Sequence, residues 1–102
     1  MSKYPIKLFR NFVKEVRSKI RIESYKLSND LLKIARLSYR EGGFSQMVST
    51  LEKYVADNRF RLTTRAVLNS CDNWRYAIRD LEMIIEMGRI YSKREISENR
   101  AS

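Results

Sequence analysis

The side chains best suited to chemistry in this sequence are the cations near its start. Lysine and arginine recur there in steps of four and three residues, which places them in one column on a helix. Such a column repels itself by about 0.2–0.5 kcal/mol per like-charged pair, so a sequence selected for stability alone would mix in glutamate. The chemistry that it offers is anion binding through charge-assisted hydrogen bonds. The column consists of Lys3, Lys7, Arg10, Lys14, Arg17 and Arg21.

The positive charge of the chain is concentrated at one end. The 102 residues include 21 Lys and Arg, 12 Asp and Glu and no His, for a formal net charge of +9. Residues 1–40 hold eleven of these cations and three of the acids, a net +8. An excess confined to one end indicates a docking face for an acidic partner. Lys33, Arg36 and Arg40 are expected to form a second basic edge on the next helix.

Missing residue types exclude several kinds of catalytic and metal site. Without histidine there is no imidazole relay, and the usual zinc and haem ligand sets cannot form. Cys71 is the only cysteine and lies in an apolar stripe, which predicts a small buried residue. Glu82 and Glu86 have no other catalytic group near them in the sequence, which predicts a solvated face. We therefore expect no enzyme activity, no metal and, because every apolar run is short, no membrane span.

Helical periodicity predicts an all-α fold, since no alternating pattern is long enough for a strand. The first helix is expected over 5–22, beginning at the only proline. The second is expected from Ser28 or Asn29 to Gly42-Gly43. Their inward stripes are expected to be Ile6, Phe9, Val13, Val16 and Ile20, and then Leu31, Leu32, Ala35 and Tyr39.

The second half of the chain is predicted to hold a short helix and a long one. Ser45 can cap the short helix, with Met47, Val48, Leu51, Tyr54 and Val55 as its apolar residues, and 57–61 are polar enough for a turn. The next apolar stripe keeps one phase through Asp72-Asn73, so we expect a single helix over 64–92. Gly88 marks close packing, room for a guest or a fraying end. The stripe comprises Val67, Cys71, Trp74, Ile78, Leu81 and Ile85.

The expected architecture is three long helices in an antiparallel bundle with one additional short helix. Residues 1–92 would form a single helical domain. Residues 93–102 would form a polar tail, loose unless a partner orders it.

A short motif at the start of the basic column resembles a known family. Leu8-Phe9-Arg10 is similar to the Leu-Tyr-Arg triplet of the LYR-motif family of small basic mitochondrial helical proteins. Residues 34–42 resemble that family's second helix, which has an Arg, an aromatic residue three positions later, a basic residue and a helix-ending Asn or Gly. Phe9 replaces the family's Tyr and Tyr39 its usual Phe, exchanges that keep bulk but move a hydroxyl.

The resemblance implies a non-enzymatic adaptor, accessory subunit or assembly factor of a mitochondrial complex, on the matrix side. Family members bind an acyl carrier protein, an acidic helical protein whose phosphopantetheine arm delivers a fatty acyl chain into the helix bundle. This chain would bind no cofactor directly, only the acyl-phosphopantetheine of its partner. The cations meeting the carrier would be Arg10, Lys14, Arg17, Arg36 and Arg40. The acyl-chain slot would be formed by Phe9, Val13, Tyr39, Met83 and Met87.

Other interpretations of the basic column remain open. A small subunit of a ribosome or another ribonucleoprotein would place it on the phosphates of ribosomal RNA, although no helix-turn-helix, zinc or RNP signature is present. A purely structural scaffold would expose an apolar face to its assembly. A basic amphipathic helix can also lie on a membrane, but the apolar stripe of the first helix is needed for the core.

Overall fold

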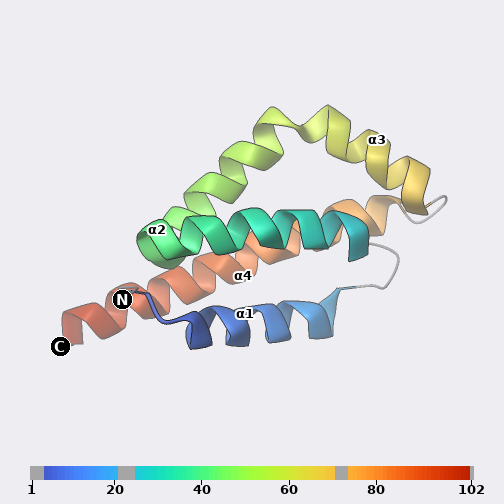
Figure 1. Cartoon of the computed structure of the whole chain (residues 1–102). Coiled ribbons are helices and arrows are strands. Elements are labelled where there is room, and N and C mark those ends of the chain that lie inside the picture. The colour runs from blue at the N-terminus through green and yellow to red at the C-terminus, as the bar shows by residue number, and fades with distance from the viewer. Residues whose placement is uncertain (1–3, 21–24, 71–73, 102) are drawn as a thin grey trace.

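The structure is a computed structural model that describes residues 4–20, 25–70 and 74–101. These ranges contain four helices: α1 (Ile6–Lys19), α2 (Tyr25–Asp57), α3 (Arg59–Ser70) and α4 (Trp74–Ala101). No strand occurs within the described ranges, and the all-α prediction is confirmed (Figure 1).

α2 consists of two helical segments joined at a kink. Gly42 and Gly43 have non-helical backbone angles, with φ 73° and ψ −165° at Gly43. That combination is open almost only to glycine, because a side chain would collide with the backbone. The predicted helix end at Gly42-Gly43 is therefore confirmed. The first segment (25–41) begins at Tyr25, before the expected start, and the second segment (44–57) takes the place of the predicted short helix.

α1, the first segment of α2 and α4 form one layer, and the second segment of α2 and α3 lie beside it. In Figure 1, α1 runs in the opposite sense to the first segment of α2 and to α4, and it packs against both. The second segment of α2 rises away from this layer, and α3 returns to pack on α4. The antiparallel arrangement thus holds for α1 against its two neighbours, whereas the first segment of α2 and α4 run in the same sense.

The carboxylate of Glu95 in α4 closes the kink of α2. It accepts hydrogen bonds from the backbone N–H of Phe44, with N–O distances of 3.2 and 3.3 Å. This N–H lies at the start of the second segment, where helix donors lack partners and negative charge is favoured. A Cβ on Gly43 would overlap the Glu95 carboxylate and the ring of Tyr4, so glycine is needed here for space as well as for backbone angle.

The C-terminal residues depart from their predicted state. α4 continues to Ala101, so residues 93–101 are helical and the last helix extends beyond the end expected at residue 92. The contact of Glu95 with the kink supplies a physical reason, since it ties this part of α4 to the start of another helix. Polar composition alone does not reveal such a contact.

The core lies where α4, α1 and both segments of α2 meet. α1 buries Phe9, Phe12 and Val16, and leaves Ile6 and Val13 only half-buried, so its core line is shifted from the predicted stripe. The inward residues expected for the second helix are all buried. The buried apolar side chains of α2 and α4 are Leu31, Leu32, Ala35, Tyr39, Phe44, Met47, Leu51, Leu81, Ile84, Ile85 and Met87.

α4 packs closely against the second segment of α2 at Gly88. A Cβ built there would lie 2.9 Å from Cε of Met47 and 3.0 Å from Cγ2 of Val48. Of the three roles considered for this glycine, the close approach of two helices is the one that the structure contains.

The prediction of one helix over 64–92 is wrong. α3 ends at Ser70 and packs against α4 as a separate helix. Cys71 lies outside the described residues, as does the side chain of Trp74. Because α3 turns back, Val67 is 44% exposed, whereas Leu81 and Ile85 of the same predicted stripe are buried in α4. The apolar spacing is continuous from Val67 to Ile85, but it does not make α3 and α4 one straight helix.

The turn predicted at 57–61 is confined to Asn58. α2 ends at Asp57 and α3 begins at Arg59, so the two helices almost abut. The Asn58 side chain donates a hydrogen bond at 2.9 Å to the carbonyl oxygen of Tyr54, which also accepts one from the Asn58 backbone N–H at 3.0 Å.

Candidate functional site

A groove between α1 and the first segment of α2 is the candidate site. Its volume is about 860 Å³. Four apolar and six cationic side chains line it, together with two asparagines. From α1 these are Ile6, Lys7, Phe9, Arg10, Asn11, Val13, Lys14 and Arg17, and from α2 they are Asn29, Leu32, Lys33 and Arg36.

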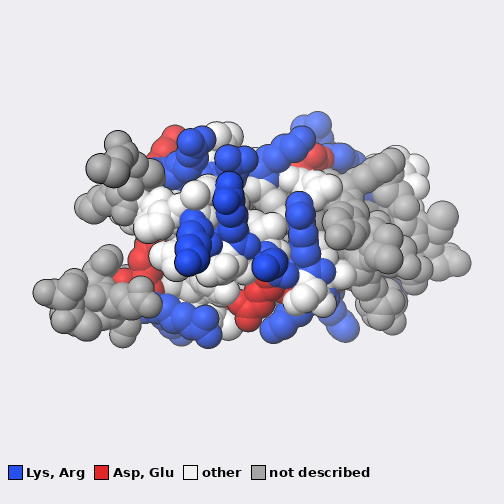
Figure 2. Space-filling model, turned by 60° about the horizontal axis from the view of Figure 1, so that its bottom comes forward, with Lys and Arg blue, Asp and Glu red and all other residues white. Residues whose placement is uncertain are grey.

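The groove has an apolar floor and a cationic rim. Phe9 and Leu32 are buried, and Ile6 and Val13 are half-buried beside them. All six cations are exposed. Figure 2 looks onto the side of the molecule where α1 lies, and shows Lys and Arg side chains gathered over uncharged surface. The arrangement follows from helix geometry, because residues three and four apart share a face and the two columns of α1 lie next to each other.

The acids nearest to this groove in sequence are engaged elsewhere. Glu15 of α1 accepts a hydrogen bond from the hydroxyl of Tyr91 in α4. Asp30 of α2 forms an ion pair with Arg65 of α3, with an N–O distance of 2.9 Å. No acid lines the groove, and none of the six cations forms an ion pair with another residue in the described part of the chain. Their mutual repulsion is therefore uncompensated within the described chain.

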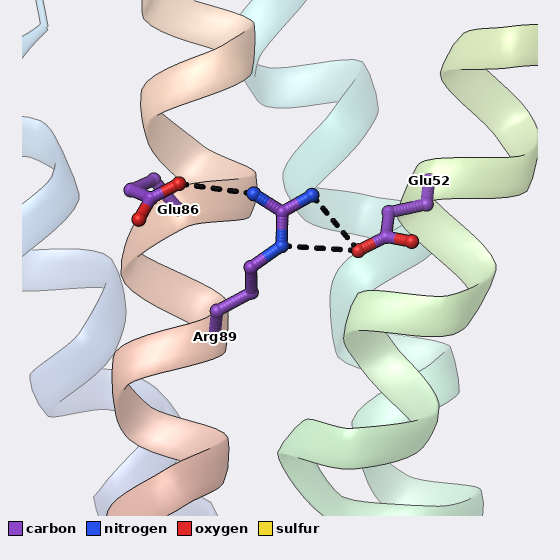
Figure 3. Close-up of polar contacts among 3 residues, drawn as sticks. All are labelled: Glu52, Glu86 and Arg89. Atoms are coloured by element: carbon purple, nitrogen blue, oxygen red, sulfur yellow. Dashed lines mark hydrogen bonds and ion pairs between the residues drawn. The ribbon is translucent and has the colours of Figure 1, made fainter.

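Arg89, in contrast, is a cation that forms ion pairs with two glutamates and links two helices. Its Nη2 lies 3.0 Å from Oε1 of Glu52, and its Nη1 lies 2.9 Å from Oε2 of Glu86 (Figure 3). The hydrogen bond to Glu52 is the main cause that raises the pKa of Arg89 above its ordinary value. Arg89 thus bridges α4 to the second segment of α2, in contrast to the cations of the groove.

Four of the five predicted carrier-binding cations meet in the groove. Arg10, Lys14 and Arg17 line it from α1 and Arg36 from α2, whereas Arg40 is exposed farther along α2 and does not line it. Lys7 and Lys33 complete the rim; both belong to the basic columns that the sequence shows, and the family resemblance left them out of the site.

The LYR-like triplet is divided between three environments. Phe9 is buried, Arg10 stands on the rim, and Leu8 is 38% exposed. The triplet therefore contributes one side chain to the floor and one to the rim of the same groove.

Two of the five residues predicted for an acyl-chain slot line this groove. Phe9 and Val13 line the groove, but Tyr39, Met83 and Met87 do not. Tyr39 is fully buried and stacks on Phe9 with ring centroids 5.4 Å apart, and Met87 is buried in α4. Ile6 and Leu32 complete the floor instead.

Tyr39 is fixed by a hydrogen bond as well as by packing. Its hydroxyl donates to the carbonyl oxygen of Pro5 at 2.8 Å, which joins α2 to the start of α1. Burial, followed by the charge of Glu95 and by Tyr4, raises the pKa of Tyr39 from 10.0 to about 12. The phenol is therefore a neutral donor at physiological pH, and it holds the two walls of the groove together at one end.

Among the described residues, no group of three His, Cys, Asp or Glu could hold a metal ion. Within the same ranges, no helix is both long and apolar enough to cross a bilayer. Comparison of the chain with family models, with curated proteins and with solved structures finds no match.

Proposed function

We propose that this chain is a non-enzymatic LYR-like adaptor, accessory subunit or assembly factor of a mitochondrial complex, and that it docks an acidic acyl carrier protein on the groove between α1 and α2. The observation that carries the proposal is an apolar floor combined with six rim cations that form no ion pair among the residues that the structure describes. The mitochondrial setting and the identity of the carrier rest on the resemblance of Leu8-Phe9-Arg10 to the family triplet.

An acidic carrier with an acyl chain suits both parts of the groove. Acidic side chains on its helices would pair with the rim, where such contacts give orientation and association rate. Part of the acyl chain would cover Ile6 and Val13, which are half-buried and open to the groove. Removing this apolar surface from water would add affinity for the acylated carrier.

An RNA-contacting subunit is the alternative, and the apolar floor makes it the weaker proposal. Phosphates would pair with the rim equally well, but they leave the floor unused. Proteins that bind single-stranded RNA usually stack bases on aromatic side chains. The aromatic residues next to the rim, Phe9, Phe12 and Tyr39, are buried and packed on one another, so they offer no such platform.

The test removes charge from the rim while leaving the floor intact. The triple variant Arg10→Gln, Lys14→Gln, Arg17→Gln should weaken binding of an acyl carrier protein by at least about tenfold, since three charge-assisted contacts are lost. The matched control is Lys53→Gln, Arg79→Gln, Lys93→Gln, which removes equal charge from exposed positions on other surfaces. Circular dichroism should show equal helicity for both variants.

Native mass spectrometry and salt titration separate the two functions. Carrier binding predicts a complex that carries the mass of acyl-phosphopantetheine, with a preference for the acylated carrier over the unacylated one. RNA binding predicts neither, and a log–log salt slope of about −0.7 for each phosphate neutralised on a single strand. Carrier binding that survives the rim triple variant would show that the groove is not the docking site.

A further inference from the structure

The outward face of α3 is apolar although the helix lies on the surface. Phe60 is 87% exposed, Leu68 75% and Val67 44%. Together with the exposed Thr64, these positions follow the spacing i, i+4, i+7, i+8, so they form one stripe. Leu62 is buried and points to the core side of the helix, so the core does not use the stripe. We call these four residues the α3 stripe.

Arginines follow one edge of the α3 stripe, and a further arginine lies beyond the other edge. On a helix of 3.6 residues per turn, Arg61 and Arg65 follow one edge and Arg59 lies beyond the other. Arg59 and Arg61 are exposed and form no ion pair within the described residues, whereas Arg65 is paired with Asp30. α3 itself contains no Asp or Glu. An apolar stripe bordered by cations complements a surface that is apolar inside and anionic outside.

The size of the stripe decides between a lipid surface and a protein. Twelve residues of helix extend about 18 Å, and one half of the accessible surface of a helix of that length is roughly 400 Å². A stable protein interface needs about 800 Å² on each partner. A lipid surface has no such minimum, because a few apolar side chains can enter the headgroup region while arginines extend to the phosphates.

We propose that α3 docks this protein on an anionic lipid bilayer surface, with Phe60, Val67 and Leu68 inserted and Arg59 and Arg61 on the lipid phosphates. α3 differs in this respect from α1, whose apolar stripe is needed for the core. Phe9, Phe12 and Val16 of α1 are buried in the core, whereas Phe60, Val67 and Leu68 of α3 are exposed to solvent. The inference is independent of the proposed carrier docking, because the two surfaces share no residue.

Cosedimentation with vesicles of equal parts phosphatidylcholine and phosphatidylglycerol tests the proposal. Wild-type protein should sediment with these vesicles and not with phosphatidylcholine alone. Phe60→Ser should lower the partition coefficient by about tenfold or more, the effect expected for withdrawing one aromatic side chain from an apolar phase. Leu37→Ser, which alters a leucine of α2 that is 63% exposed, is the matched control and should leave the partition coefficient unchanged.

A second pair of variants tests the role of the arginines. Arg59→Gln with Arg61→Gln should weaken vesicle binding more than Lys53→Gln with Lys93→Gln, although both pairs remove equal charge. The proposal is overturned if wild-type protein does not bind the anionic vesicles, or if Leu37→Ser weakens binding as much as Phe60→Ser. It is also overturned if the rim triple variant of the groove abolishes binding while Phe60→Ser does not. A wild-type dimer that Phe60→Ser converts to monomer would assign the stripe to a second copy of the chain instead.

Discussion

Reversing one rim charge should stabilise the free protein while it abolishes docking. Lys14 stands between Arg10, four residues before it, and Arg17, three residues after it, and all three are exposed. Lys14→Glu turns two repulsive helix pairs into attractive ones. Since each pair of either sign is worth about 0.2–0.5 kcal/mol, the substitution should stabilise the fold by roughly 1–2 kcal/mol. For a domain of this size the melting temperature should rise by about 5–10 °C.

The assay is urea unfolding followed by circular dichroism at low and at high salt. The gain from Lys14→Glu should shrink in concentrated salt, because the Debye length falls to about 3 Å at 1 M. Lys53→Glu is the control with the opposite sign. Lys53 is exposed on α2 four residues before Asp57, so its reversal replaces an attractive pair by a repulsive one and should destabilise the fold slightly.

A destabilising effect of Lys14→Glu would refute the reasoning. It would mean that the rim cations are balanced within the free protein, so that their alignment would no longer call for an external anion. If the variant instead is more stable and no longer binds the carrier, the wild-type rim cations favour binding and lower the stability of the free protein.

Two further predictions concern the kink and the end of the groove. Gly43→Ala forces a side chain into backbone angles reserved for glycine and displaces Glu95 from Phe44, so urea unfolding should show that the free energy of unfolding falls by about 3 kcal/mol. The double variant Gly43→Ala with Glu95→Ala should lose less stability than the two single variants summed. Strictly additive losses would contradict the predicted overlap between the new Cβ and the Glu95 carboxylate. The pKa of Tyr39 is raised from 10.0 to about 12 in the folded state, so its contribution to stability is complete below pH 10 and is lost as the pH rises through 12. Tyr39→Phe should therefore flatten the fall of the unfolding free energy between these two pH values, and an unchanged slope would show that this phenol is not responsible.

The proposed site could be predicted in part because it depends mainly on local geometry. Arg10, Lys14 and Arg17 lie on one helix, so their spacing is enough to align them. Arg36 joins them only because α2 returns beside α1 after the intervening link, and helix pairing of this kind is frequent in small bundles. Arg40 shares the column of Arg36 in sequence but not the groove, because the groove ends before it.

The residues that form the groove floor could not be predicted in the same way. Tyr39 and Met87 are apolar enough to line a cavity, yet both are used to fill the core. Residue type states that a side chain will avoid water, but it does not say whether another side chain or a ligand will cover it. That distinction depends on how four separate segments meet, which no single periodic pattern contains.

Sequence by itself determined the helical class, the Gly42-Gly43 break and the alignment of the basic column, since each depends on backbone preferences or on spacing within one helix. Tertiary structure decided where the long apolar stripe divides, which side of α3 faces solvent and why α4 continues past residue 92. These outcomes depend on contacts between residues far apart in the chain, such as Glu95 with Phe44 and Asp30 with Arg65. The free energy of such contacts is comparable to the helix preferences that they override, so local pattern alone cannot settle them.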